Sequence, residues 1–402
     1  MLARRKGDCF VYTTGQPQSF LVNRPEFVRH VLVDRAAHYS KDTPINSGFD
    51  STIASGLLTS EGEAWRRQRA LIQPYFARRR LPELADVVCA QFDSMSWQWD
   101  RAAARGEVID LSFAMSLLTF RLTAAALFHA DTSPRDEKLV HILTDALPVL
   151  TDLSEEAFRV AQAELGSVAF QLVAERLGAN HTDDLFNGLR TSNTDEAHAW
   201  AVFDHVVTML LAGYETTASV ITWACYLLAH HPAVRSELEG HLRAVAGDRP
   251  LVQSDLPSLP YLMAVVRETM RLYPPAWIIG RRALDADRIG DTDIAPQSVV
   301  AISPYTLHRH PRYWNDPERF DPRRFRNDEA EQRREPFSYI PFGAGPRTCI
   351  GSNFALVEAP LVIGRLVQRY QMTLASDESV QPRGIFVLVP SSPIHMRLTR
   401  RN

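Results

Sequence analysis

Hydrophobic positions dominate one long stretch of the chain, residues 201–231, and predict its central helix. Apolar residues there cover most of the helix circumference, which is typical of a helix buried on all sides. Asp204, His205 and Glu215 interrupt the stretch too often for a membrane span. The apolar positions are Val202, Phe203, Val206, Met209, Leu210, Val220, Ile221, Trp223, Tyr226 and Leu227.

Shorter patterns near the start of the chain predict a small sheet followed by a helix. Residues 9–14 and 18–23 flank Gly15-Gln16-Pro17 and read as two strands of a hairpin. Pro25 then opens a helix that carries Phe27, Val28, Val31 and Leu32 on one face.

The second half of the chain mixes helices with short strands. A helix must end at Tyr273, because two prolines follow it. Residues 276–310 alternate apolar runs with turn signals and predict strands, and residues 381–399 predict a terminal hairpin that turns at Gly384-Ile385-Phe386. Since helical periods also fill residues 83–190, we expect a mainly α protein with small β-sheets, an α+β fold.

Composition limits the number of domains and the kinds of binding partner that we expect. The chain has 402 residues without a linker-like tract or a repeat, so we expect one domain over residues 1–402. A formal net charge of −3 argues against nucleic-acid binding. The four cysteines show no disulfide or zinc spacing, and the first residues lack the apolar segment of a signal peptide, which favours a cytoplasmic protein without a membrane anchor.

The run Phe342-Gly343-Ala344-Gly345-Pro346-Arg347-Thr348-Cys349-Ile350-Gly351 carries the strongest chemical signal. Gly343 and Gly345 allow tight turns, and they present Cys349 close to the start of an apolar helix, where free N–H groups favour a thiolate. An isolated cysteine is usually a packing residue. A dinucleotide site is excluded, because Thr348 stands where the third glycine of that motif belongs.

A second motif, Ala212-Gly213-Tyr214-Glu215-Thr216-Thr217, lies in the middle of the long helix. Gly213 weakens a helix, and Thr216 can donate a hydrogen bond back to the carbonyl of Ala212, so we expect a local opening of the helix there. A buried Glu215 is costly unless it is paired or used. The alternative is that Glu215 pairs with a basic neighbour and that Thr216 caps a kink.

Two further patterns involve arginine. Glu268 and Arg271 lie three residues apart on one helix face, an arrangement that is usually a surface ion pair, and a Pro-Glu-Arg-Phe segment with Arg319 follows. Trp65 and Arg69 lie four apart, so an indole N–H and a guanidinium on one face could jointly bind a carboxylate.

The helix-centre motif, E-x-x-R, P-E-R-F and the cysteine loop occur in the order that resembles the cytochrome P450 family, from residue 25 onward. The resemblance implies a fold that holds haem b (iron protoporphyrin IX) between the long helix and the cysteine loop with its following helix. It makes Cys349 the axial ligand of the iron, in a loop with Phe342, Gly343, Arg347 and Gly351. In that family a helix and a proline-rich lead precede the first hairpin, and residues 1–8 do not contain them; either the start codon is assigned late, the sequence is trimmed, or the protein does without this helix.

The resemblance also assigns roles to the other motifs. Trp65, Arg69, Arg281 and Arg347 bind the haem propionates, with Arg282 as the alternative to Arg281. Thr216 hydrogen-bonds the dioxygen that is being activated, Glu215 relays protons, and Glu268, Arg271 and Arg319 form a structural network. The expected pocket residues are Phe49, Ile53, Leu57, Val206, Leu210, Trp277, Ile278 and Phe386.

The implied function is a haem-thiolate monooxygenase that hydroxylates or epoxidises a mid-sized, mostly apolar molecule of bacterial secondary metabolism. It would be a monomer that uses O2 and takes electrons from a separate ferredoxin and ferredoxin reductase. Oxidative C–C or C–N coupling by the same haem oxidant is the alternative outcome. A non-catalytic haem ligand-binder and a peroxide-driven enzyme are disfavoured, because Glu215 and Thr216 are both present.

Overall fold

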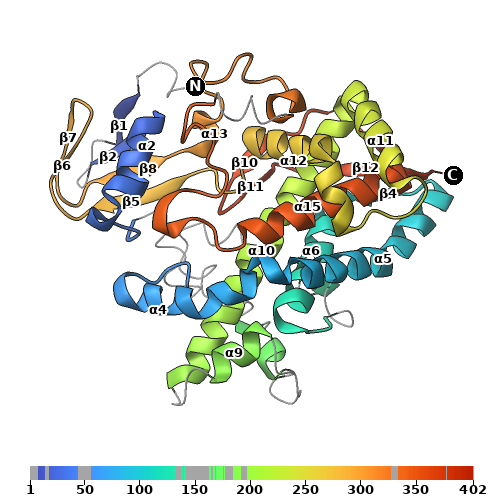
Figure 1. The fold of residues 1–402 in the computed structure, drawn as a ribbon, viewed down its shortest axis with the longest axis horizontal. Helices are drawn as coiled ribbons and strands as arrows, with labels where there is room; N and C mark the ends of the chain where they lie inside the picture. Colours follow the sequence, from blue (N-terminus) through green and yellow to red (C-terminus); the bar gives the residue numbers. More distant parts are fainter. Residues whose placement is uncertain are drawn as a thin grey trace.

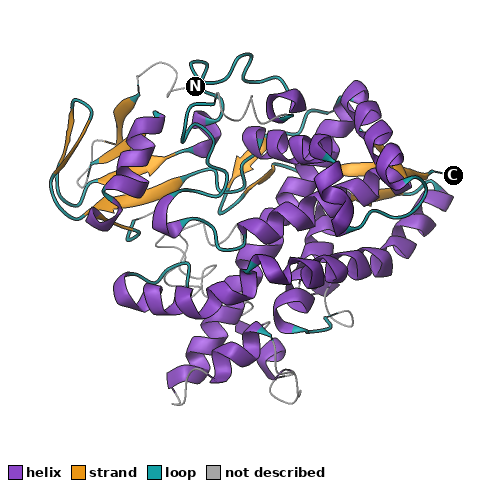
Figure 2. Ribbon diagram, viewed as in Figure 1, coloured by secondary structure: helices purple, strands orange, loops and turns teal. Residues whose placement is uncertain are grey.

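The computed structural model describes residues 8–13, 18–43, 56–132, 137–138, 140–141, 163, 166–167, 169–174, 176, 184–191, 197–326, 334–376 and 378–401. Helices make up most of this part, and strands gather in separate small sheets (Figure 2). The predicted fold class, mainly α with small sheets, is confirmed. The helices are α2 (Pro25–Arg29), α4 (Gly62–Ile72), α5 (Leu81–Arg105), α6 (Leu111–Phe128), α9 (Leu185–Thr191), α10 (Ala197–His230), α11 (Pro232–Ala246), α12 (Pro260–Leu272), α13 (Pro304–Leu307) and α15 (Ser352–Arg369).

The long helix α10 runs through the middle of the molecule (Figure 1). It packs against α6, α9, α11, α12 and α15, so helices surround it as its apolar pattern predicts. Its start lies four residues before the expected one, at Ala197. The helix α12 ends at Leu272, directly before Tyr273 and the two prolines, also as predicted.

The helix α6 is the one described helix that is long and apolar enough to cross a membrane by length and composition. Its 18-residue apolar window is 72% buried inside the protein. The side chain of Asp110 caps its first turn by accepting a hydrogen bond from the Phe113 N–H at 3.1 Å. The burial of α6 against α10 and α5 identifies it as a core helix.

A five-stranded sheet with the strand order β1-β2-β8-β5-β3 lies to one side of the helices (Figure 1). The predicted first hairpin is confirmed, with Cys9 opposite Val22, whereas β2 and β8 run parallel. A short hairpin, β6 and β7, follows β5 in the chain. The strands of this half are β1 (Cys9–Thr13), β2 (Ser19–Val22), β3 (Tyr39–Ser40), β5 (Ile279–Ala283), β6 (Asp287–Ile289), β7 (Thr292–Ile294) and β8 (Val299–Ile302).

The chain end departs from the predicted single hairpin over residues 381–399. The strands β10 (Pro382–Gly384) and β11 (Leu388–Pro390) do pair, but β12 (His395–Arg400) leaves them. It lies between β4 (Val108–Asp110) and β9 (Tyr370–Leu374) in a three-stranded sheet. The prediction was wrong here because both partners of β12 are distant in sequence, and local patterns carry no information about them.

Candidate functional site

The cysteine loop is held in shape by its two glycines. Gly343 and Gly345 both have φ of 72°, the left-handed conformation that glycine adopts most easily. A Cβ on Gly345 would also lie 1.8 Å from the carbonyl oxygen of Leu32, so only glycine fits. The Cys349 N–H donates to the carbonyl of Phe342 at 3.0 Å and closes the loop. The loop therefore presents Cys349 in a fixed position just before α15.

The side chain of Cys349 is exposed by accessible area, yet the protein around it desolvates the thiol. The two observations agree if the sulfur faces a recess in the protein rather than open solvent. Burial raises the pKa of Cys349, while the N–H groups of Gly351 and Ser352 and the charge of Arg69 lower it. The same N–H groups hold a thiolate once the proton has been displaced by a metal.

The predicted propionate residues come together from distant parts of the chain. The guanidinium of Arg347 lies 4.2 Å from the centre of the Trp65 ring, and that of Arg69 lies 5.8 Å from it. Burial lowers the pKa of Arg281 to about 10, and repulsion from Arg347 adds to this effect. Burial also lowers the pKa of Arg347, where repulsion from Arg69 opposes the attraction of Glu61. Three positive charges thus crowd one region.

The hydrogen bonds of these arginines leave donors for a ligand. Arg69 donates to the carbonyl of Thr348 at 2.9 Å, and Arg281 donates to that of Gly280 at 2.8 Å. The Nη1 atom of Arg347 is buried without a partner among the described residues. Because a guanidinium carries five N–H donors, this cluster can still bind carboxylates.

The neighbouring Arg282 is engaged elsewhere. Its Nε donates to the backbone carbonyl of Asp42 and lies 3.4 Å from the Asp42 carboxylate. The side chain that couples electrostatically to Arg347 is Arg281. The geometry therefore favours Arg281 over Arg282 as the propionate ligand, and this role stays a prediction.

A cysteine sulfur held just before α15 and a group of arginines that can bind carboxylates fit a haem. Cys349 would hold its iron, and Trp65, Arg69, Arg281 and Arg347 would hold its propionates. An anion that sits among the three guanidinium groups would also offset the repulsion that lowers the pKa of Arg281. The site thus defines the class of a haem-thiolate protein.

The helix-centre motif lies within an unbroken stretch of α10. The expected opening at Gly213 is therefore not observed, although Thr216 does donate to the carbonyl of Ala212 at 2.8 Å. Gly213 has another role: its Cβ, if present, would lie 2.7 Å from Thr123 of α6. Glycine there permits the close approach of the two helices.

Glu215 is almost fully buried, with 8% of its surface exposed. Its Oε2 has no hydrogen-bond partner in the described part of the chain. Burial raises the pKa of Glu215 to about 7, although the neighbouring Tyr214 hydroxyl opposes this shift. A carboxyl group with this pKa can both accept and release a proton near neutral pH, as the predicted relay role requires.

Sequence reasoning missed a second buried carboxyl group, Glu358 on α15. Burial raises its pKa to about 8, and a contact with the Thr217 hydroxyl opposes the shift. Its Oε1 lacks a partner within the described ranges. Glu358 thus lies beside the residue that follows Thr216, and it is the one polar residue in the otherwise apolar stretch 354–363 of α15. That exception was the signal that could have found it.

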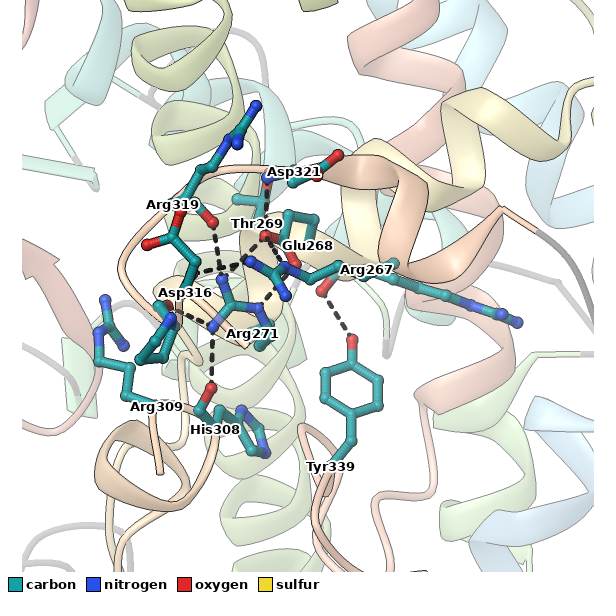
Figure 3. Close-up of polar contacts among 12 residues, drawn as sticks. Arg267, Glu268, Thr269, Arg271, His308, Arg309, Asp316, Arg319, Asp321 and Tyr339 are labelled. Atoms are coloured by element: carbon teal, nitrogen blue, oxygen red, sulfur yellow. Dashed lines mark hydrogen bonds and ion pairs between the residues drawn. The ribbon is translucent and has the colours of Figure 1, made fainter. Parts of the chain in front are cut away.

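Glu268 and Arg271 form a buried ion pair rather than a surface pair, and neither side chain is exposed. Arg271 also donates to the backbone carbonyls of His308, Pro317 and Arg319 (Figure 3). Arg319 therefore joins the network through its main chain only, and Figure 3 shows its side chain directed away from Glu268.

The second guanidinium near Glu268 belongs to Arg324, whose Nε lies 3.4 Å from Glu268 Oε1. The expectation that the Arg319 side chain is the third member of the network is corrected: the side chain near the carboxylate is that of Arg324. The sequence repeats Pro-x-Arg-Phe at residues 317–320 and 322–325, and only the fold decides which arginine reaches the carboxylate.

Three of the pocket candidates lie near one another at the β10–β11 hairpin. Trp277 donates from its ring nitrogen to the carbonyl of Ile385 at 2.8 Å, next to Phe386, and Ile278 follows it. Gly384 has Trp277 so close that a Cβ would lie 2.6 Å from the indole. Trp277, Ile278 and Phe386 are all partly exposed, so their pocket role stays a prediction that their surroundings allow.

The remaining candidates differ in their surroundings. Val206 and Leu210 are buried in the main core, on the side of α10 that carries Gly213 and Tyr214 and meets α6. Leu57 is buried in the same core, and its neighbour Gly56 contacts α10. Phe49 and Ile53 lie outside the described residues. The pocket role of these five residues is an untested prediction.

Comparisons with known proteins show the family of this chain. The sequence matches the Cytochrome P450 family over residues 1–172 and 175–398. It is 33% identical to cyclooctatin synthase from Streptomyces melanosporofaciens over 398 residues, which cover 94% of this chain and 85% of that protein. The chain belongs to the cytochrome P450 family.

Two further relatives carry the names of their reactions. Cyclooctat-9-en-7-ol 5-monooxygenase from Streptomyces melanosporofaciens is 30% identical, with 91% of this chain and 83% of that protein covered. Pentalenene oxygenase from Streptomyces avermitilis is 28% identical, with 98% of this chain and 91% of that protein covered. The chain is thus an oxidoreductase of the P450 monooxygenase type.

Proposed function

We propose that this protein is a haem b monooxygenase that inserts one oxygen atom from O2 into a mid-sized cyclic hydrocarbon skeleton of the terpenoid type. The observation that carries the proposal is the pair of Glu215, buried with a pKa of about 7, and Thr216, which together can deliver protons. A haem iron held by a cysteine thiolate supplies strong electron donation that favours O–O cleavage.

The substrate class rests on relatives and on the pocket candidates. Pentalenene and cyclooctat-9-en-7-ol, the compounds in the names of two relatives, are by those names cyclic alkenes with one hydroxyl group or none. Trp277, Ile278 and Phe386 offer apolar surface for such a skeleton. The secondary metabolism of a bacterium is the setting that this chemistry favours.

Electrons would come from a separate ferredoxin and its reductase, with the protein acting as a cytoplasmic monomer. Arg66 and Arg67 on α4 are exposed, in the helix that also carries the haem-site residues Trp65 and Arg69. An acidic ferredoxin is a suitable partner for such a surface, because opposite charges steer association.

The test of the oxygen-activation role is the yield of product per electron. Thr216→Ala should lower product per NADH consumed by at least about tenfold and release the balance as peroxide or water, because the hydroxyl that positions the proton is lost. Thr216→Ser keeps the hydroxyl and should retain most of the yield. An undiminished yield in Thr216→Ala would show that the hydroxyl does not act in proton delivery.

Oxidative C–C or C–N coupling remains the second candidate, because the same oxidant can remove hydrogen from a substrate that then closes on itself. The mass of the product separates the two reactions. Gain of one oxygen atom supports the monooxygenase, whereas loss of two hydrogen atoms supports coupling.

A further inference from the structure

Glu61 directly precedes α4 and lies one helical turn before the haem-site residue Trp65. Its backbone carbonyl accepts a hydrogen bond from the Trp65 N–H at 3.2 Å, which starts the helix. A polar side chain at this position commonly accepts a hydrogen bond from an N–H of the first turn. The side chain of Glu61 makes no such bond, so its carboxylate serves another contact.

The Glu61 carboxylate binds the end of β3 instead. Its Oε1 accepts a hydrogen bond from the backbone N–H of Lys41. The strands β3 and β5 are antiparallel, with Ser40 opposite Arg282. Lys41 follows Ser40, so the chain there continues toward the Arg281 side of β5. The carboxylate is thus held next to the strand that carries Arg281.

The chain that leads to Glu61 is also fixed by hydrogen bonds. The Nζ atom of Lys41 donates to the carbonyl of Leu58. The backbone N–H of Ser60 donates to the carbonyl of Gly56 at 2.9 Å, and its hydroxyl donates to the side chain of Gln68 at 2.6 Å. Glu61 is exposed, but these contacts give its carboxylate a defined place.

The charge of Glu61 acts on two arginines of the predicted propionate site. Burial lowers the pKa of Arg281 and that of Arg347, and attraction to Glu61 opposes this effect in both. Among the described residues, Glu61 is the one acidic side chain that acts on both guanidinium groups in this way. Arg347 also lies 4.2 Å from the centre of the Trp65 ring, one turn from Glu61. Glu61 therefore lies at the edge of the arginine group.

The charges of a haem-loaded site do not balance without Glu61. Arg69, Arg281 and Arg347 supply three positive charges, whereas a haem brings two propionates. One positive charge would be left over in a partly buried region, where an unpaired charge is costly. The carboxylate of Glu61 brings the sum to zero.

We infer that Glu61 is the third carboxylate of the haem site, and that it lowers the reduction potential of the haem iron by neutralising the arginine charge that the two propionates leave over. Reduction adds one negative charge to the haem, so a fixed carboxylate nearby disfavours it and a surplus arginine charge favours it. Glu61 acts through the arginines and is a positioning residue for their charge. The inference rests on the haem of the proposed function and adds a residue that sets how readily this haem accepts an electron.

The test measures the reduction potential of the substrate-free, haem-loaded protein by anaerobic spectroelectrochemical titration. Glu61→Gln removes the charge, while the side-chain carbonyl of glutamine can still accept from the Lys41 N–H. Its potential should be more positive than that of wild type. Glu61→Asp keeps the charge and should stay close to the wild-type value. Because Glu61 is exposed, an increase in ionic strength from about 0.1 M to about 1 M should shrink the difference between wild type and Glu61→Gln.

Glu63→Gln is the matched control. Glu63 lies in the first turn of the same helix, and its replacement removes the same charge from the protein. Its carboxylate pairs with the exposed Arg66 at 2.9 Å rather than with the haem-site arginines. The potential of Glu63→Gln should therefore equal that of wild type.

The rate of haem release separates the effect of the charge from an effect on the fold. Glu61 repels the propionates that the arginines attract. Glu61→Gln should therefore release haem to excess apomyoglobin about fivefold more slowly than wild type, the effect of one unit charge near the protein surface. Loss of a structural contact would instead speed the release.

An unchanged potential in Glu61→Gln, an equal shift in Glu63→Gln, or faster haem release from Glu61→Gln would overturn the role of Glu61. These three outcomes leave the proposed function standing. A wild-type protein without the spectrum of a haem thiolate would overturn both.

Discussion

Two groups of buried polar side chains in this protein differ in whether their polar atoms have hydrogen-bond partners. Arg271 has five N–H donors, and all five are used: two bonds reach the Glu268 carboxylate, and three reach backbone carbonyls. On α10, by contrast, Glu215, His205 and Thr208 each have a buried atom without a partner in the described residues. Buried polar groups that the chain satisfies serve the fold, whereas a carboxyl group that it leaves open, as in Glu215, can bind and release a proton.

The largest expected effect is on stability, from Arg271→Ala. The change leaves the Glu268 charge buried without its main partner and leaves three carbonyls without a donor, which costs about 3–5 kcal/mol. We expect little soluble haem-loaded protein, measured by the haem absorbance per mole of protein and by the Tm of what remains.

Arg309→Ala is the control for this prediction. Arg309 is similarly buried, at 7% exposed, but it pairs with the exposed Glu318 and stacks on Tyr305 at 4.0 Å. Its loss should cost less, because no buried charge is left behind. A Tm for Arg271→Ala equal to that of Arg309→Ala would contradict the view that the complete network supports the fold.

Replacement of the unpaired Glu215 carboxyl group should stabilise the protein at high pH rather than destabilise it. The pH dependence of the Tm of Glu215→Gln tests this expectation. Glu215 has a folded pKa of about 7 against an ordinary value of 4.5. The folded protein therefore keeps a proton that the unfolded chain releases, so this residue's contribution is fully present below pH 4.5 and is lost as the pH rises through about 7. Glutamine cannot ionise and lacks this loss.

We expect wild type and Glu215→Gln to have similar Tm values at pH 4.5, and the variant to be the more stable one at pH 8. The difference corresponds to about 3 kcal/mol, from 1.36 kcal/mol per pKa unit. Glu358 adds a slope of the same sign in both proteins, which cancels in the comparison. Glu107 is an exposed carboxylate, so Glu107→Gln is the control, and its Tm should follow that of wild type at each pH. Parallel curves for wild type and Glu215→Gln would show that the carboxyl finds a partner in the folded protein.

The sequence predicts strongly periodic or motif-bound features well. The long helix, the first hairpin and the end of α12 follow from local apolar spacing and prolines, and the cysteine loop follows from its glycines. Features that depend on packing between distant segments could not be predicted. The partners of β12 and the reason for Gly213, which is the approach of Thr123, appear only in the fold.

Candidate site residues divide in the same way. Residues that belong to a motif, such as Cys349, can be predicted from the sequence, whereas the unpaired state of His205 and Thr208 depends on every neighbour and has no sequence signal. The two Pro-x-Arg-Phe segments are an intermediate case. Both contain an arginine at the same place in the segment, and the backbone path between them decides which side chain turns inward.

The smallest expected effect is the difference in stability between variants of Arg319 and Arg324. It tests which of the two side chains completes the network around Glu268. Arg324 is mostly buried and lies next to Glu268, and its Nη2 also donates to the carbonyl of Asp316 at 2.8 Å. Arg324→Ala should therefore lower stability by about 1–2 kcal/mol, the cost of losing a charged hydrogen-bond donor. Arg319 is exposed and contributes only its carbonyl, which alanine retains, so Arg319→Ala should stay within about 0.5 kcal/mol of wild type. Thermal unfolding of the two haem-loaded variants in parallel measures the order. The reverse order would mean that the Arg319 side chain turns inward in solution, and that Glu268 is completed by a different guanidinium.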